Sequence, residues 1–422
     1  MAERLYYTDS FLSSFPARVT DVREVSRTAG QSLWQLALDR TAFYPASGGQ
    51  PSDTGSIVAA SRSGTTIEVP VLDVQESDVQ EESGEVWHFT EKPLAAGTEV
   101  KAAINWTRRL DHMQQHSGQH LLSAVFAAEL QALTVSFHLG EESSTIDLTS
   151  EGITPAGLER VELVANGIIA EDRTISALTV SRDEAQALLA AGRLRKLPER
   201  TGTMRLIEID NYDLNACGGT HLRSTGQIGG IHLRSTERVR QGVRVEFVCG
   251  LRAAKVAHRD HALLSRTAAL LSVAAAELPQ SVERLLGEAK SSAKERQKLR
   301  EELADYHASR LIVEDQIHDG LRIVQRIFAD RDAAYCKLLA SRVVAAAPQT
   351  LALIASTQQE PAAVVMARSP GLHFSCADLL RDQLAQLGLR GGGSPDMAQG
   401  QAPRKEMESL LNALNSAARM AK

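Results

Sequence analysis

Two short motifs contain the side chains best suited to bind a metal ion. His116 and His120 are four positions apart, which on a helix places both imidazoles on one face, one turn from each other. Cys217 and His221 have the same spacing, but the two glycines between them favour a tight loop over a helix. Three imidazoles and one thiolate form a set that suits tetrahedral zinc. We therefore predict one zinc ion bound by these four side chains.

The chemistry of such an ion stays open at this point. A zinc peptidase helix carries a glutamate directly after its first histidine, and here Ser117 stands in that position, which disfavours a peptidase. Four protein ligands are typical of structural zinc, whereas catalytic zinc keeps one position for water. The site therefore has either three firm ligands and one exchangeable ligand, or an ion that only positions a substrate.

Two further histidines lie close to these motifs in the sequence. His112 precedes His116 by one helical turn and is either a hydrogen-bond partner of the site or a surface residue. His138, in Ser-Phe-His-Leu-Gly, either lines the pocket or ends a strand. Residue type and spacing alone do not decide between these interpretations.

The composition is that of a folded protein with more than one domain. The chain has 422 residues, of which 43% are hydrophobic and 23% charged, and this length predicts two or three domains. The sequence has no apolar run of roughly 18 residues, as a membrane span requires. Its start lacks the apolar core of a signal peptide, and four widely spaced cysteines do not form a disulfide framework. We expect a cytoplasmic protein that does not engage a membrane.

The charge is unevenly distributed along the chain. A net charge of −6 argues against a generally basic nucleic-acid binder. Between Cys217 and Arg259, however, eight cations occur with only two anions, Glu237 and Glu246. This stretch is either a local basic stripe that contacts phosphates or a solvated face with scattered arginines.

The residue patterns predict an α+β protein with four parts. Residues 1–105 contain short alternating or β-branched runs around a glycine-rich loop at 43–55, which predicts a β-barrel-like subdomain. Residues 106–251 combine a helix beginning near Arg108 with a second helix at 155–171 and four strands, and form the zinc-containing part. The predicted strands are 134–139, 144–148, 204–209 and 243–249.

The second half of the chain has a different composition. Residues 252–313 are rich in alanine, leucine, glutamate and lysine, and Pro279 divides them into two helical stretches. Their weak heptad pattern favours a helical hairpin or a short dimer contact over a long coiled coil. Residues 314–422 alternate apolar runs with helical stretches, which predicts a small α/β domain.

Four segments of the first 250 residues closely resemble the editing domain of alanyl-tRNA synthetase and its free-standing AlaX relatives. In that family's order they are Thr41–Gly55, His116–Leu122, Ser136–Gly140 and Cys217–His221. The segment 391–400, Gly-Gly-Gly-Ser-Pro-Asp-Met-Ala-Gln-Gly, resembles the DHH-associated domain that ends alanyl-tRNA synthetases. The resemblance covers nearly the whole chain and implies the long AlaX form.

The resemblance implies a trans-editing hydrolase that removes serine, with glycine as a second candidate, from mischarged tRNA-Ala. It implies the same four zinc ligands, His116, His120, Cys217 and His221. It also implies that tRNA-body recognition, and dimerisation as a further candidate role, belong to the C-terminal half. Since an aminoacyl ester is already reactive, one positioned water and one polarised carbonyl suffice for hydrolysis.

The glycine-rich loop supplies the remaining candidate residues that the resemblance implies. Thr41 and Gln50 are the candidate catalytic residues, while Gly48 and Gly49 permit close approach of the backbone to the substrate. Alternatively, Thr41 is a strand hydroxyl and the glycines only turn the chain. In the tail, Gly391, Gly392 and Gly393 either contact RNA phosphates through backbone amides or form a turn that packing requires.

Two other classes of protein compete with the hydrolase. The first is a non-catalytic tRNA- or RNA-binding protein in which zinc is structural. The second is a phosphoesterase, suggested by the DHH-associated tail. The paired aspartates and histidines of a two-metal centre are not visible in the sequence, so we set the phosphoesterase aside.

Overall fold

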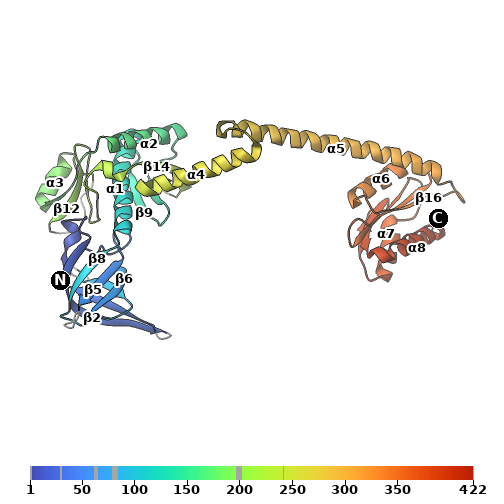
Figure 1. Ribbon diagram of the computed structural model, residues 1–422. Coiled ribbons are helices and arrows are strands. Elements are labelled where there is room, and N and C mark those ends of the chain that lie inside the picture. The colour runs from blue at the N-terminus through green and yellow to red at the C-terminus, as the bar shows by residue number, and fades with distance from the viewer. Residues whose placement is uncertain are drawn as a thin grey trace. The chain divides into compact units, whose positions relative to one another are not determined.

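The computed structural model describes residues 2–28, 31–60, 65–77, 84–195, 202–240 and 242–421. Within them the chain forms two compact units, residues 1–266 and 267–422 (Figure 1). Both units combine helices with sheets, so the predicted α+β class is confirmed. The three boundaries between the four predicted parts remain predictions.

The first unit begins with a closed, antiparallel six-stranded barrel, which confirms the barrel-like subdomain (Figure 1). Its strands alternate buried and exposed residues, because one face of each strand points into the barrel. The barrel core includes Phe15, Leu36, Ile57 and Val69. In barrel order the strands are β2 (Ser14–Thr28), β3 (Gln31–Leu38), β7 (Val86–Thr90), β6 (Thr66–Glu76), β5 (Gly55–Ala60) and β8 (Glu99–Ile104).

Short elements precede and interrupt the barrel. The strand β1 (Glu3–Arg4) pairs in parallel with β4 (Arg40–Thr41), and the 3-10 helix η1 (Leu5–Tyr7) follows β1. The predicted glycine-rich loop at 43–55 runs from β4 to the start of β5. This loop therefore connects the small β1–β4 sheet to the barrel strand β5.

Helix α1 (Trp106–Leu130) follows the barrel and is the central helix of the first unit. Its N-terminus is capped by Asn105, whose side chain accepts a hydrogen bond from the Arg108 amide. The helix is buried almost all round from His112 to Phe126, so it lacks the solvated face of a surface helix. Both histidines of the first motif lie in this buried stretch.

Two antiparallel sheets complete the first unit. The larger has the order β14 (Ile231–Val239), β15 (Gly242–Cys249), β10 (Ser144–Leu148) and β9 (Thr134–Leu139). The smaller consists of β11 (Ile175–Val180), β12 (Met204–Ile209) and β13 (Asp213–Ala216). The accompanying helices are α2 (Pro155–Ala170), α3 (Arg182–Ala190) and the 3-10 helix η2 (Thr225–Ile228). The strands predicted at 134–139, 144–148 and 204–209 are confirmed.

The predicted break between the two long helices needs a correction. Helix α4 (Gly250–Leu271) ends before Ser272, a residue with a left-handed backbone, and the 3-10 helix η3 (Ala275–Glu277) leads into α5 (Leu278–Glu314). Pro279 therefore lies in the first turn of α5, where the N–H that proline lacks has no helical partner. The hairpin packing of these helices remains a prediction.

The second unit is built on a five-stranded sheet covered on both faces. The residues of β17 are all buried, and the core clusters on its two faces include α5 with α6 and α7 with α8, respectively. The sheet order is β16 (Arg322–Phe328), β17 (Thr350–Ser356), β18 (Ala362–Arg368), β20 (Met397–Ala402) and β19 (Gly391–Gly393). The helices are α6 (Ala333–Ala346), α7 (Cys376–Gln386) and α8 (Met407–Met420). The predicted small α/β domain is thus a three-layer arrangement.

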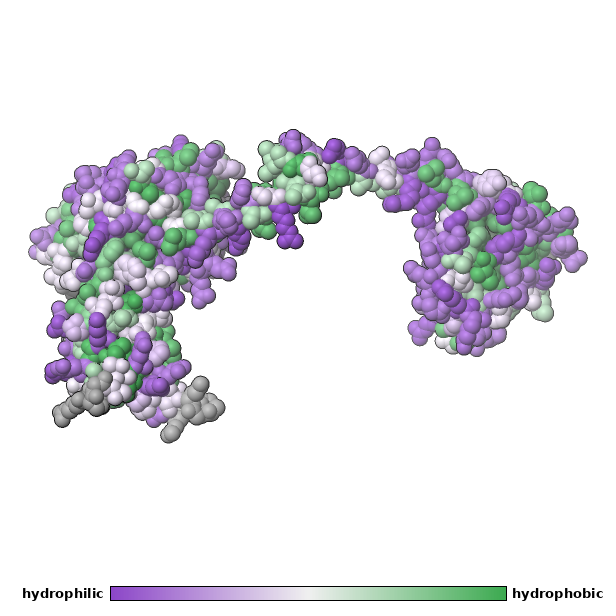
Figure 2. Space-filling view, in the orientation of Figure 1, coloured by the Kyte–Doolittle hydropathy of each residue, from purple (hydrophilic) through white to green (hydrophobic). Residues whose placement is uncertain are grey.

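Within the described part of the chain, no single helix is both long and apolar enough to cross a membrane. Only taken together, as a bent pair, do α4 and residues 275–314 meet that length and composition. Most of the surface visible in Figure 2 is hydrophilic.

Candidate metal centre

The structure brings the four predicted ligands together. His116 and His120 project from α1, while Cys217 and His221 lie in the loop between β13 and η2. The candidate ligand atoms all lie within 4.8 Å of one another. The Cys217 Sγ atom is 3.4 Å from His116 Nε2 and 3.3 Å from His221 Nε2. Ligands about 2.0–2.3 Å from a tetrahedral ion are roughly 3.3–3.6 Å apart, so these distances fit one metal ion.

Burial gives the three histidines the protonation state that a metal requires. It lowers the pKa of His120 to about 4 and holds the pKa values of His116 and His221 well below the ordinary value. The imidazoles are therefore neutral near pH 7 and free to donate a lone pair. Burial raises the pKa of the Cys217 thiol, so its ionisation needs a nearby positive charge such as a metal ion.

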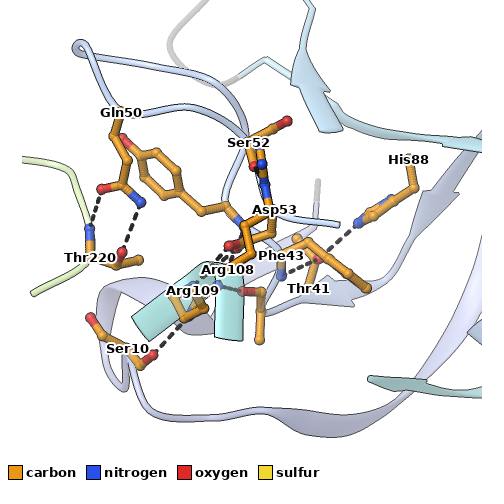
Figure 3. A network of polar contacts seen from close by, with 12 residues as sticks. Ser10, Thr41, Phe43, Gln50, Ser52, Asp53, His88, Arg108, Arg109 and Thr220 are labelled. Carbon is orange, nitrogen blue, oxygen red and sulfur yellow. Dashed lines mark hydrogen bonds and ion pairs between the residues drawn. The ribbon is translucent and has the colours of Figure 1, made fainter. Parts of the chain in front are cut away.

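Two of the histidines are oriented by hydrogen bonds to their other nitrogen. His116 Nδ1 is 2.8 Å from Oε1 of Gln50, which belongs to the glycine-rich loop. His221 Nδ1 is 3.2 Å from the hydroxyl of Ser117 on α1. Such contacts fix the ring orientation of metal-binding histidines. The Gln50 side chain also reaches Thr220, in the loop that carries His221 (Figure 3).

A half-buried arginine holds the loop that contains Cys217. The guanidinium of Arg205, on β12, donates to the carbonyl oxygens of Cys217 and Gly219 at 2.8 and 2.9 Å. It also donates to the carbonyl of Tyr7 and stacks on that ring. Arg205 therefore fixes the loop backbone that presents the thiol, and the sequence motifs do not reveal this role.

The loop approaches α1 so closely that only glycine fits at position 219. A Cβ atom at Gly219 would lie 2.2 Å from His116 Cε1 and 2.9 Å from Gln50 Oε1. A Cβ atom at Gly218 would have atoms of the Tyr7 side chain as its nearest neighbours, at 3.8 Å. The donor set, its spacing and this close approach together fit a bound metal ion. The identity of the metal remains a prediction.

The glycine-rich loop lies beside this cluster. Gly48 and Gly49 are exposed and have positive φ angles of 56° and 83°. The Leu139 amide, at the end of β9, donates to the Gly49 carbonyl. A Cβ atom at Gly49 would lie 2.8 Å from the ring of Phe137. The loop is therefore packed against the edge of β9.

Phe137, and not His138, faces the metal cluster. The Phe137 ring lies 5.5 Å from the His116 ring, measured between centroids. The next side chain, His138, is exposed, because successive residues of a strand point to opposite faces. The alternation of β9 is the sequence signal that identifies Phe137, once the side of the sheet that packs on α1 is known.

Thr41 is enclosed in the barrel. Its side chain has no solvent exposure, and its hydroxyl is 2.8 Å from His88 Nε2. The same hydroxyl accepts a hydrogen bond from the Phe43 amide (Figure 3). His88 Nδ1 lies 3.0 Å from the Leu36 carbonyl. Direct contact of Thr41 with a substrate would require this network to open, so its catalytic role remains a prediction.

His112 lies on the same side of α1 as His116 and is buried, so the surface interpretation of His112 is wrong. Its Nδ1 atom has no hydrogen-bond partner among the described residues, and burial lowers its pKa to about 4. It makes no hydrogen bond with a metal ligand in the described part of the chain, so a role in the site remains a prediction.

The glycines of the tail form the edge strand β19 of the second unit and not a turn. Gly391, Gly392 and Gly393 pair with Gly400, Gln399 and Ala398 of β20. A Cβ atom at Gly391 or Gly393 would meet neighbouring atoms at 2.4 or 2.2 Å. Packing therefore explains two of the three glycines, and the contact with RNA remains a prediction.

Several cations of the basic stretch between Cys217 and Arg259 form ion pairs with nearby carboxylates. Arg244 forms two hydrogen bonds with Asp147, and Arg252 forms two with Asp111. Arg234 and Arg259 both lie near Asp260. Within the described residues, Arg238, Arg240 and Lys255 have no ion pair. Much of the stretch is thus a paired surface, and these three cations are the best candidates for phosphate contacts.

The barrel, the buried helix and the His₃Cys cluster define an α+β protein with a candidate metal site. Comparisons with known proteins refine this class. The model of class II (A) tRNA synthetases matches residues 2–108. The model of the second additional domain of threonyl- and alanyl-tRNA synthetases matches residues 204–245. The second match includes Cys217, His221 and Arg205.

Three alanine–tRNA ligases are similar over most of the chain. Those of Pyrococcus abyssi and Natronomonas pharaonis are 30% and 32% identical, and each match covers 98% of this chain and 43% of the relative. That of Pyrococcus furiosus is 33% identical, over 71% of this chain and 31% of the relative. The chain thus spans less than half the length of these relatives. It belongs to the alanyl-tRNA synthetase-like family and is consistent with an AlaX-like protein.

One solved structure, the C-Ala domain of Aquifex aeolicus alanyl-tRNA synthetase, is 16% identical with a TM-score of 0.23. The match covers 25% of this chain and 96% of that domain. A likeness this low carries no inference about the present protein.

Proposed function

We propose that this chain is a trans-editing hydrolase that deacylates mischarged tRNA-Ala, with Ser-tRNA-Ala as the main substrate and Gly-tRNA-Ala as the second. The observation that carries the proposal is the convergence of His116, His120, Cys217 and His221 beside an exposed glycine-rich loop. Family membership supports a tRNA as the substrate. We propose zinc as the metal because imidazole and thiolate ligands in this number suit it.

The reaction is attack of water on the ester carbonyl that joins the amino acid to the tRNA. When bound, zinc supplies a positive charge that stabilises the oxyanion formed at that carbonyl. The chain contributes backbone N–H groups at the mouth of the site. Those of Gly48 and Gly49 are used in no hydrogen bond among the described residues, and both positions are exposed. We assign these amides to the ester carbonyl or the terminal ribose.

Selectivity requires that Ala-tRNA-Ala is spared. Serine exceeds alanine by one hydroxyl, and a site that hydrogen-bonds this hydroxyl discriminates strongly. Thr41 remains the candidate that the family resemblance supplies, although its hydroxyl is bound to His88 in this structure. Phe137 limits the space beside His116 and is therefore a candidate for excluding larger side chains.

The second candidate function is a non-catalytic tRNA-binding protein with structural zinc. Its specific support is the complete set of four ligands, which leaves no open position on a tetrahedral ion. Two variants separate the candidates. Cys217→Ala is expected to lower the release of serine from Ser-tRNA-Ala at least 100-fold, while Cys376→Ala, in the second unit, retains it. Circular dichroism checks that both variants are folded. Equal rates of hydrolysis by both variants would show that the metal site takes no part in the reaction.

The C-terminal half retains the two roles proposed from the sequence, contact with the tRNA body and formation of a homodimer. Helix α5 exposes Leu286 and Leu299, which are available for such a contact. Sedimentation of the whole chain across a range of concentrations measures whether it dimerises. A chain that stays monomeric at high concentration would exclude this contact.

A further inference from the structure

Gln50 connects three segments that are far apart in the sequence. It comes from the glycine-rich loop of the barrel, His116 comes from α1, and Thr220 comes from the loop that carries two of the metal ligands. The Gln50 side chain is 2% exposed, so its polar atoms depend on partners within the protein. Figure 3 shows its amide directed at Thr220.

The hydrogen bonds of Gln50 identify its oxygen without ambiguity. The Thr220 backbone N–H is always a donor, and it lies 3.1 Å from Gln50 Oε1. A flipped amide would direct its own N–H groups at this donor, so the oxygen must face Thr220 N. The amide nitrogen then donates to Thr220 Oγ1 at 2.8 Å.

The identity of this oxygen fixes the proton on His116. Gln50 Oε1 is an acceptor, so His116 Nδ1, 2.8 Å away, must carry the hydrogen. The lone pair of the neutral ring is then on Nε2, the nitrogen that lies 3.4 Å from Cys217 Sγ. The contact with Gln50 therefore selects the ring form that can bind a metal at Nε2.

We propose that Gln50 is a positioning residue for metal binding and does not read the substrate. It holds His116 as a ready ligand, and it makes the order of the glycine-rich loop depend on the bound metal. The inference rests on the proposed metal site, but it does not depend on which substrate the site acts on. Since coupling between two equilibria is reciprocal, the metal orders the loop to the same extent that the ordered loop strengthens metal binding.

The partners of Gln50 argue against a direct role in substrate binding. Its oxygen already accepts two hydrogen bonds, and one of its two N–H groups is used by Thr220. A substrate would have to displace His116 or Thr220 to reach the oxygen. A positioning role needs no such exchange.

The test compares zinc affinity in three variants of the whole chain. Zinc ions are titrated in competition with a coloured chelator, in the absence of any tRNA. Gln50→Ala removes the acceptor and is expected to weaken zinc binding by about 10- to 100-fold. Gln50→Glu keeps an acceptor for His116 Nδ1 and is expected to bind zinc within about threefold of the unmodified protein, or more tightly. Gln75→Ala, an exposed glutamine of the same barrel, is the matched control and is expected to change nothing.

Hydrogen exchange of the loop amides provides the second measurement. Zinc is expected to slow exchange at residues 47–50 in the unmodified protein and in Gln50→Glu, but not in Gln50→Ala. Unchanged zinc affinity in Gln50→Ala, with or without loss of hydrolysis, would overturn the positioning role. An equal loss of affinity in Gln50→Ala and Gln50→Glu would also overturn it, because the acceptor would then not be what matters. Failure of the hydrolase proposal leaves both measurements unaffected.

Discussion

Arg109 and Asp53 form an ion pair in which neither side chain has any solvent exposure. Arg109 also donates to the carbonyl oxygens of Ser10 and Ala42, and Asp53 accepts a hydrogen bond from the Tyr44 amide. The pair therefore joins α1 to the barrel at the end of the glycine-rich loop (Figure 3). Because α1 carries His116 and His120, this joint sets the position of the loop over the metal site.

Breaking this ion pair should destabilise the first unit strongly. Arg109→Met leaves the Asp53 carboxylate buried without its partner, which typically costs about 3–5 kcal/mol. The free energy of unfolding, measured with urea, checks this value. Arg18→Met breaks the exposed pair with Glu99 and is the control, with an expected change below about 1 kcal/mol. Similar losses of unfolding free energy in both variants would show that burial does not make the Arg109–Asp53 pair more important than an exposed pair.

The stability of the barrel should depend on pH through His88. Burial lowers the pKa of His88 to about 4 in the folded state, while the unfolded ring titrates near 6.5. Between these values the unfolded chain binds the extra proton, so the stability due to neutral His88 is complete above pH 6.5 and is lost as the pH falls toward 4. At 1.36 kcal/mol per pKa unit, the loss reaches roughly 3 kcal/mol.

A variant isolates the contribution of His88 from that of the other buried histidines. We expect His88→Asn to be less stable than the unmodified protein at pH 7, and the difference to shrink as the pH is lowered. Urea unfolding at several pH values between 4.5 and 7.5 measures this difference. The exposed His138→Asn is the control. A difference that stays constant with pH would show that the folded barrel does not lower the pKa of His88.

Metal binding should stabilise the first unit selectively. Zinc bound by four side chains of the folded loop and helix adds about 2.7 kcal/mol when its free concentration is 100 times the Kd. Calorimetry is expected to show that zinc raises the unfolding temperature of one unit and leaves that of the other unchanged. Cys217→Ala should abolish the shift and Cys376→Ala should retain it. A shift that survives Cys217→Ala would place the metal elsewhere.

The two glycines between Cys217 and His221 should differ in their tolerance of a methyl group. Gly219→Ala introduces a Cβ atom that overlaps the His116 ring, whereas Gly218→Ala meets only Tyr7 at van der Waals distance. We expect Gly219→Ala to weaken zinc binding at least 10-fold and Gly218→Ala to have little effect. Competition with a chelator measures both. The same affinity in both variants would contradict the close packing of this loop against α1.

The sequence predicts those elements of the first unit whose local patterns are strong, but the prediction misses α3, β11, β13 and β14. The strand 134–139 alternates and is followed by a turn, and its predicted bounds agree with β9. The two motifs taken together, each with its ligand spacing, likewise predicted the His₃Cys cluster. The helix break predicted at Pro279 was wrong. Proline inside a helix interrupts it, but proline is also favoured in the first turn of a helix, where Pro279 lies.

The contacts that tune the site could not be read from local patterns. Thr41 meets His88 across 47 positions, and Gln50 meets Thr220 across 170. Such pairs depend on barrel closure and on the packing of the barrel against α1. The spacing of apolar residues along the sequence does not reveal either. For the same reason Phe137 was missed, because alternation gives two faces of a strand but does not say which one packs against α1.

Amino-acid release from Ser-tRNA-Ala, Gly-tRNA-Ala and Ala-tRNA-Ala, measured with and without a zinc chelator, tests the editing function itself. We expect rapid loss of serine, slower or comparable loss of glycine, and retention of alanine, with hydrolysis stopped by the chelator and restored by added zinc. A folded, zinc-loaded protein that hydrolyses none of the three esters would contradict the editing function and favour the tRNA-binding protein with structural zinc.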